Sequence, residues 1–126
     1  MSAYTHSGVV YFAVAGKYIK VGYCAGDLRT RLKQLVGGRG VITPDDYDIA
    51  APIQLVGTIP GCVIRDERRL HGLLAAHHVA GEWFRYDSAF LDHMLSMRYV
   101  TYRETLLHFR HARAELKRRP SLAVAA

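Results

Sequence analysis

Residues 8–23 read G-V-V-Y-F-A-V-A-G-K-Y-I-K-V-G-Y and decide the fold. The run 8–15 is β-branched and aromatic, Gly16-Lys17 interrupts it, and residues 18–23 alternate polar with apolar side chains. Two such runs separated by two residues that include a glycine are typical of a β-hairpin. The sequence therefore predicts a two-stranded hairpin that turns at Gly16-Lys17.

A two-residue turn also fixes the register of the hairpin. It sets three opposed pairs, namely Ala15 with Tyr18, Ala13 with Lys20, and Tyr11 with Gly22. Because side chains alternate along a strand, one face receives the polar groups of Tyr11, Tyr18 and Lys20. The other face is apolar and consists of Val10, Phe12, Val14, Ile19, Val21 and Tyr23.

The rest of the chain predicts one more strand and several helices. Asp27 is placed to cap a helix with apolar positions at Leu28, Leu32, Leu35 and Val36, which Gly37-Gly38 would end. Residues 39–52 are predicted as loop. A strand is predicted at 53–59, ended by Pro60-Gly61. A helix follows at 63–78, with an apolar stripe of Val63, Leu70 and Leu74. The last predicted elements are a short aromatic segment at 82–86, a helix capped by Ser88, and a helix at 99–119.

The composition fits one globular domain. The chain has 126 residues, of which 50% are hydrophobic and 22% charged, so it is short for two domains and too apolar for disorder. We expect a domain over 1–97 and a basic helix and tail over 98–126. No uncharged apolar run is long enough to span a bilayer, and residues 1–7 contain no leader-like pattern. The two cysteines favour a reduced, cytoplasmic protein without a cysteine zinc site.

Positive charge is concentrated near the end of the chain. Residues 98–119 carry seven basic and two acidic side chains, which is +5 of the formal net charge of +6. Such an asymmetry favours a polyanionic partner, because clustered positive charge attracts phosphates. A solvated helix face accounts for the same pattern equally well.

Two charged residues flank apolar helix stripes. Glu67 shares a stripe with Leu70 and Leu74, and an inward carboxylate needs a cation or a metal. A rim glutamate paired with an arginine of its own helix is the alternative. Arg31 flanks the stripe of the first helix, where a guanidinium could bind a phosphate through two hydrogen bonds. An ordinary surface arginine is the alternative there.

Tyr11 and Lys20 are the hairpin residues best suited to chemistry. Tyr11 faces Gly22, and a glycine at that place lets a ligand or backbone come close. Lys20 could lower the pKa of a neighbouring phenol or contact a phosphate. Most of the eight tyrosines are expected to be packing residues.

Five short motifs in a fixed order resemble the GIY-YIG nuclease superfamily. They are V-V-Y at 9–11, K-V-G at 20–22, D-L-R-T-R-L-K-Q-L at 27–35, E-R-R-L-H-G-L-L at 67–74 and G-E-W-F at 81–84. The closer resemblance is to the branch with KIG in place of YIG, which comprises phage Orf172-like DNA-binding domains and meiotically up-regulated fungal homologues. It spans about residues 8–84 and leaves the basic C-terminal segment uncovered.

This resemblance implies an α+β fold with a small three-stranded antiparallel sheet flanked by helices, to which the chain adds a basic C-terminal helix. It also implies cleavage of DNA with one divalent ion, commonly Mg²⁺, or another such as Mn²⁺. The catalytic residues that it implies are Tyr11, Lys20, Arg31 and Glu67, with Glu67 as the metal ligand. Arg31 would stabilise developing charge, and a deprotonated Tyr11 or a water would supply the nucleophile.

The residues expected to contact nucleic acid are Tyr18, Lys20, Arg29, Lys33, Arg103, Arg110, Arg113 and Lys117. Lys20 departs from the nuclease pattern, because it stands where the YIG motif has a tyrosine, and Tyr18 could substitute for that tyrosine. We expect Trp83 and Phe84 to cover the apolar face of the sheet. Glu82 is considered as a second carboxylate beside Glu67 but is not assigned to the metal.

Three hypotheses follow for the function. The first is a metal-dependent DNA endonuclease, and the second is a DNA-binding module of the same fold without cleavage. The third is a protein-interaction domain whose C-terminal helix presents Leu106, Phe109 and Leu116 to itself or to a partner chain. The sequence leaves the oligomeric state open.

Overall fold

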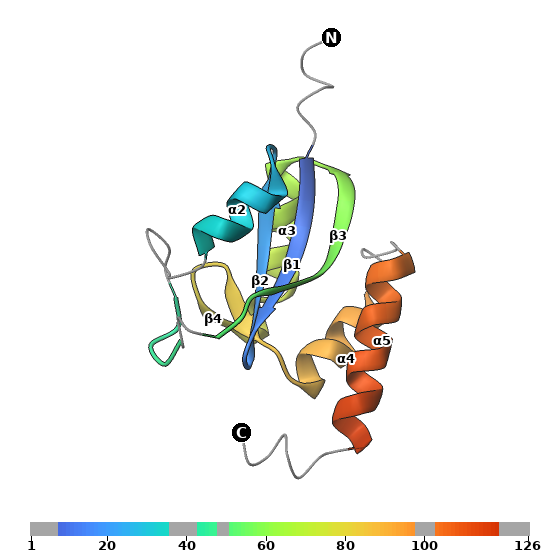
Figure 1. Cartoon of the computed structure of the whole chain (residues 1–126). Helices are drawn as coiled ribbons and strands as arrows, with labels where there is room; N and C mark the ends of the chain where they lie inside the picture. The colour runs from blue at the N-terminus through green and yellow to red at the C-terminus, as the bar shows by residue number, and fades with distance from the viewer. Residues whose placement is uncertain (1–7, 36–42, 48–50, 98–102, 119–126) are drawn as a thin grey trace.

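The computed structural model describes residues 8–35, 43–47, 51–97 and 103–118 (Figure 1). Its strands are β1 (Gly8–Ala15), β2 (Tyr18–Cys24), β3 (Gln54–Cys62), β4 (His78–Ala80) and β5 (Trp83–Arg85). Its helices are α2 (Leu28–Leu35), α3 (Ile64–Leu73), the 3₁₀ turn η1 (Ala75–His77), α4 (Ser88–Ser96) and α5 (Arg103–Arg118).

The hairpin of β1 and β2 forms in the predicted register. Tyr11 pairs with Gly22, Ala13 with Lys20 and Ala15 with Tyr18. The apolar face packs into the main core, to which it contributes Val10, Phe12, Ile19 and Val21, with Val14 and Tyr23 at its margin. The hairpin prediction is therefore confirmed in both its turn and its two faces.

The sheet has five antiparallel strands in the order β3-β1-β2-β5-β4, so the prediction of three strands is wrong. The missing strands lie in 78–85, which the sequence assigns to a helix end and an aromatic piece. Each has three residues, which is too short for a recognisable alternation. They form because the outer edge of β2 supplies hydrogen-bond partners at residues 18–20.

Strand β3 is longer than predicted, because it continues through Pro60 and Gly61 to Cys62. Proline lacks a backbone donor and normally ends a central strand. In the sheet order, however, β3 is the outermost strand beside β1, where a missing donor leaves no ladder bond unmade on the solvent side. The position of the strand explains why Pro60 does not end it.

The first helix begins as predicted and two later helices differ. Asp27 accepts hydrogen bonds from the Arg29 amide and the Thr30 hydroxyl, which caps α2. Helix α3 spans only Ile64–Leu73, and Val63 is exposed ahead of it instead of joining the stripe of Leu70 and Leu74. Helix α4 is capped by Asp87 and not by Ser88, because the Asp87 carboxylate accepts the Phe90 amide at 2.9 Å.

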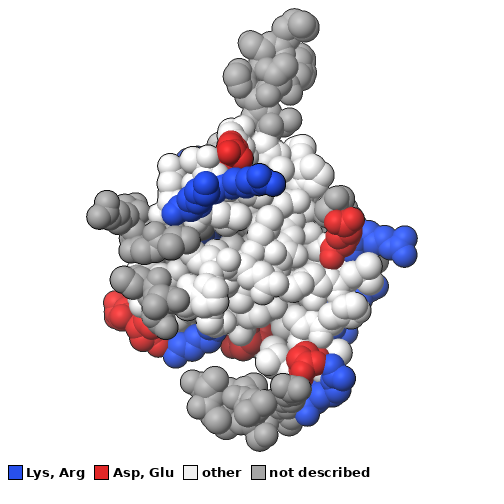
Figure 2. Space-filling model, in the orientation of Figure 1, with Lys and Arg blue, Asp and Glu red and all other residues white. Residues whose placement is uncertain are grey.

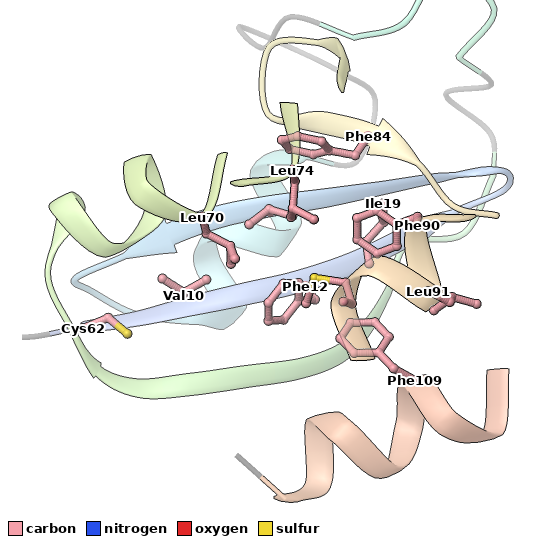
Figure 3. Close-up of a cluster of buried hydrophobic side chains, with 12 residues drawn as sticks. Val10, Phe12, Ile19, Cys62, Leu70, Leu74, Phe84, Phe90, Leu91 and Phe109 are labelled. Carbon is pink, nitrogen blue, oxygen red and sulfur yellow. The ribbon is translucent and has the colours of Figure 1, made fainter. Parts of the chain in front are cut away.

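Two helices lie on opposite faces of the sheet. Helix α3 covers the apolar face and contributes Leu70 and Leu74 to the main core, together with Phe84 and Phe90 (Figure 3). Helix α2 crosses the other face (Figure 1), where Leu28 and Leu32 pack against a smaller cluster around Tyr11. Helix α2 thus covers the polar face of the hairpin.

Helix α5 packs onto the body of the protein. The Phe109 ring is fully buried and meets Phe12 edge to face, with ring centroids 5.4 Å apart (Figure 3). The buried Thr105 hydroxyl donates to the Thr58 carbonyl, and a Cβ at Gly57 would lie only 2.5 Å from that hydroxyl. A glycine in β3 therefore permits close docking of the helix.

The predicted domain boundary after residue 97 falls at 98–102, outside the described residues.

The docking of α5 removes the surface that the third hypothesis needs. Leu106 and Leu116 are partly buried against the same core that contains Phe109. The apolar face expected to meet a partner chain is therefore already occupied by the protein's own sheet and α4.

No described helix has the length and apolar character needed to cross a bilayer.

Candidate functional site

Tyr11 lies across the hairpin over Gly22. A Cβ at Gly22 would come within 2.5 Å of the Tyr11 hydroxyl and ring, so only glycine admits the ring in this position. The Tyr11 side chain is almost fully buried. Burial raises the pKa of its phenol well above the usual range, and the nearby charge of Glu82 raises it further. The phenol therefore stays protonated at neutral pH.

Glu67 and His71 cover the part of the β2 edge that β5 leaves open. The His71 Nε2 lies 2.7 Å from the Val21 carbonyl oxygen. A carbonyl only accepts hydrogen bonds, so this nitrogen carries the proton and donates. One turn earlier, the Glu67 carboxylate accepts the backbone N–H of Tyr23. His71 is thus a partly buried histidine that is hydrogen-bonded to the backbone of β2.

The Glu67 carboxylate carries a negative charge that its surroundings compensate poorly. The residue is 6% exposed, and burial together with the charge of Glu82 raises its pKa to about 7. Its contact with His71 is 3.7 Å long and involves the nitrogen already bonded to Val21. The expected alternative, a rim ion pair with an arginine of α3, is absent from the described contacts of Glu67.

Lys20 and Glu82 form a partly buried ion pair. Their charged atoms are 2.9 Å apart, and the Lys20 side chain is only 5% exposed whereas that of Glu82 is 38% exposed. The backbone carbonyl of Glu82 accepts the Val21 amide, which fixes Glu82 beside β2. The Lys20 ammonium also lies 5.6 Å from the centre of the Trp83 ring. Lys20 is therefore held in place by β5 and the turn before it.

Five segments, namely β1, β2, α2, α3 and the turn before β5, contribute ionisable groups that act on Tyr11 or Glu67. The pKa of Tyr11 responds to Glu82, Arg31 and Glu67, with Arg31 acting to lower it. The pKa of Glu67 responds to Glu82 and, in the opposite direction, to Lys20. We call these five residues, Tyr11, Lys20, Arg31, Glu67 and Glu82, the edge cluster, because Glu67 and Glu82 both bond to the outer edge of β2.

Helix α2 presents exposed positive charge beside the edge cluster. Arg29, Arg31 and Lys33 are all exposed, and Figure 2 shows Lys and Arg side chains running across the face where α2 lies. Of these three, Arg31 influences Tyr11. The helix thus joins a solvent-facing basic strip to the buried phenol.

Tyr18 lies outside the edge cluster, and Trp83 borders it at Lys20. The Tyr18 hydroxyl donates a short hydrogen bond to Asp46, which also pairs with Lys17 at 2.7 Å. Trp83 is fully buried on the same face as Tyr18 and packs against Tyr47. The expectation that Trp83 covers the apolar face is wrong, since alternation along β5 sends only Phe84 there. Neither ring is exposed for base stacking.

Glu82 is the member of the edge cluster that the sequence did not assign. Its place depends on β5, a three-residue strand that joins the sheet beside a segment about sixty positions earlier in the chain. The only sequence signal is its position in the G-E-W-F motif. Had the sequence predicted that the G-E-W-F motif pairs with residues 18–20 as a strand, it would also have predicted that Glu82 lies beside Lys20.

Glu67 and Glu82 are the two carboxylates of the edge cluster that could hold a divalent cation. No group of three or more potential metal ligands occurs in the described residues. Mg²⁺, however, is commonly bound through one or two carboxylates and completes its shell with water and phosphate oxygens. Burial first and the charge of Glu82 second raise the pKa of Glu67, and a bound cation would favour its ionised form.

Comparisons with known proteins identify the family. No match is found among curated proteins or among solved structures. Residues 3–99 match the profile described as the T5orf172 domain, which covers most of the chain and stops before α5. The chain therefore belongs to the T5orf172 domain family.

Proposed function

We propose that this chain binds DNA and cleaves its phosphodiester bonds with the help of a divalent cation, as a nuclease of GIY-YIG type. The observation that carries the proposal is the edge cluster, in which the buried Tyr11 phenol over Gly22 responds to the charges of Arg31, Glu67 and Glu82 from three other segments. Perturbed ionisable groups that gather beside exposed positive charge are typical of catalytic sites. Membership of the T5orf172 family supports DNA as the substrate.

Each residue would have a distinct role in the reaction. Glu67, with Glu82 beside it, would hold the cation, which would supply positive charge to the phosphate oxygens. Arg31 is exposed at the site and would stabilise charge that develops on the phosphorus centre. Arg29 and Lys33 would bind neighbouring phosphates along the basic strip of α2.

The nucleophile in this proposal is water and not the tyrosine. Burial and Glu82 keep the Tyr11 phenol protonated, so it is poorly suited to attack phosphorus as a phenolate. A protonated phenol can instead donate a hydrogen bond to a phosphate oxygen or orient a water molecule. This assignment selects the water from the two nucleophiles that the resemblance implies.

DNA binding without cleavage is the second candidate, and the Lys20–Glu82 ion pair favours it. Lys20 stands at the position of the nuclease tyrosine and is committed to Glu82 at 2.9 Å. Because the Lys20 ammonium already neutralises Glu82, less negative charge remains there to attract a metal ion. In this candidate, the α2 strip binds phosphates and the edge cluster is structural.

A plasmid-nicking assay with and without Mg²⁺ tests the proposal. Wild type is compared with Glu67→Gln, Arg31→Ala and the control Arg65→Ala, an exposed arginine of α3 that has no role in the proposed reaction. Gln retains an acceptor for the Tyr23 amide, and thermal unfolding followed by circular dichroism verifies that the variant is folded. We expect Mg²⁺-dependent nicking that falls at least about 100-fold in the first two variants and little in the control. Nicking that survives both substitutions refutes the site, and DNA binding without nicking by wild type favours the second candidate.

A further inference from the structure

The basic residues of α5 divide into two groups by their partners. Arg113 is half-buried and pairs with Asp92 at 3.4 Å, and Arg118 pairs with Glu115 on its own helix. Among the described residues, no acidic partner is found for the remaining three, which are all exposed: Arg103, Arg110 and Lys117. Arg113, which the sequence analysis expects to contact nucleic acid, is thus paired with a carboxylate in the structure.

The three remaining residues form a single line along the helix. They are spaced by seven positions, which is two helical turns with a drift of only about 20° around the axis per step. Successive members are separated by about 10 Å along the axis, and the line is about 21 Å long. Between them on the same side lie Leu107 and Ala114, which bring no negative charge.

The opposite side of α5 is fixed to the protein core. Thr105 and Phe109 are fully buried there, so the line of charge points away from the body. An interfacial membrane helix must insert its apolar face into lipid, and this helix has already buried that face. A rigid row of cations with a single exposed leucine, Leu107, beside it instead suits the phosphate backbone of a nucleic acid.

We propose that α5 is a second DNA-contact element, in which Arg103, Arg110 and Lys117 bind backbone phosphates. The proposal rests on the proposed function only in taking DNA as the polyanion. It adds a surface that the family match does not cover, since that match ends at residue 99. In Figure 1, α2 and α5 lie at different places around the sheet, so the chain would contact DNA through two separate surfaces.

The salt dependence of DNA binding tests this proposal. Binding of wild type to a labelled duplex is measured by fluorescence anisotropy over a range of salt concentrations. The triple variant Arg103→Gln, Arg110→Gln, Lys117→Gln is compared with the control triple variant Arg85→Gln, Arg113→Gln, Arg118→Gln. Both lose three charges, but those of the control are ion-paired in the structure. Thermal unfolding followed by circular dichroism verifies that each variant is folded.

Each phosphate contact contributes about 0.9 to the slope of log affinity against log salt. We expect the slope to fall by about 2 to 3 in the first variant and by less than about 1 in the control. Equal changes in both variants would mean that only net charge matters, and would overturn the proposal. It would also be overturned by an unchanged slope in the first variant, or by binding to anionic vesicles in preference to duplex DNA. These outcomes are independent of nicking, which depends on Glu67.

Discussion

At the scale of the residue, Glu67 combines a structural contact with an unfavourable charge. Its carboxylate accepts the Tyr23 amide at the open edge of β2, which a neutral side chain could do as well. The negative charge itself is opposed by burial and by Glu82. A residue that weakens its own fold when ionised is expected where a cation or a substrate later compensates it.

The stability of the protein should report this unfavourable charge. The pKa of Glu67 is raised from 4.5 to about 7 in the folded chain. Protonated Glu67 therefore contributes to the free energy of unfolding in full below pH 4.5, and this contribution is lost as pH rises through 7. The glutamine of Glu67→Gln does not ionise, so the stability of that variant lacks this pH dependence. We expect wild type to lose at most about 3 kcal/mol relative to the variant between about pH 5 and about pH 8. Urea unfolding in a chelator measures this, and parallel pH profiles would contradict it.

The Lys20–Glu82 pair should show coupling between its members. Lys20→Met leaves Glu82 unpaired near Glu67 and should lower the free energy of unfolding by about 1 to 3 kcal/mol. Glu82→Gln leaves Lys20 near the opposite charge of Glu67, so it should lower that free energy by less. The double variant should lose less than the sum, with a coupling of about 1 kcal/mol. Denaturant melts of the four proteins complete the cycle. Strict additivity would mean that the ion pair is not formed in solution.

At the scale of the element, local signals were sufficient where the interaction is local. The Gly16-Lys17 turn fixed the register of β1 and β2, and Asp27 identified the start of α2. Strands β4 and β5 were missed because three residues carry no periodicity and gain partners only from β2. For the same reason, Tyr11 and its partner Gly22 could be predicted, whereas Glu82 could not be placed.

The close approach of Tyr11 to Gly22 gives a test at this scale. A Cβ at Gly22 would overlap the Tyr11 ring at 2.5 Å, and the buried ring cannot move freely. Gly22→Ala should lower the free energy of unfolding by about 1 to 3 kcal/mol and shift the ultraviolet titration of tyrosine toward ordinary values. Gly72→Ala is the control, because its Cβ would meet no atom within 4 Å. Equal stability of the two variants would show that the strands tolerate the side chain.

At the scale of the whole molecule, a basic C-terminal helix is built into the core of a T5orf172 domain. Amphipathic spacing and charge predicted the helix itself, but the residues with which its apolar face packs lie far away in the chain. Phe109 reaches Phe12 in the first strand, and Thr105 meets Gly57 in β3. No local pattern could distinguish this docking from a partner-binding face.

The docking of α5 makes the helix part of the folding unit. Phe109 is fully buried between Phe12 and Phe90, so Phe109→Ala should lower the free energy of unfolding of the whole chain by about 3 to 5 kcal/mol. Leu107→Ala, at an exposed site of the same helix, should have little effect. Chemical denaturation followed at the single tryptophan measures both. A Phe109→Ala chain that unfolds like wild type would mean that α5 is detached in solution.

The central claim is that Arg31 and Glu67 act together with Tyr11 in one DNA-cleaving site. A double-mutant cycle on the single-turnover rate of Mg²⁺-dependent cleavage tests it most directly. If the two side chains serve one transition state, the double variant Arg31→Ala, Glu67→Gln should cleave about as slowly as the slower single variant. Wild type that does not cleave, or losses that multiply fully in the double variant, would contradict the claim.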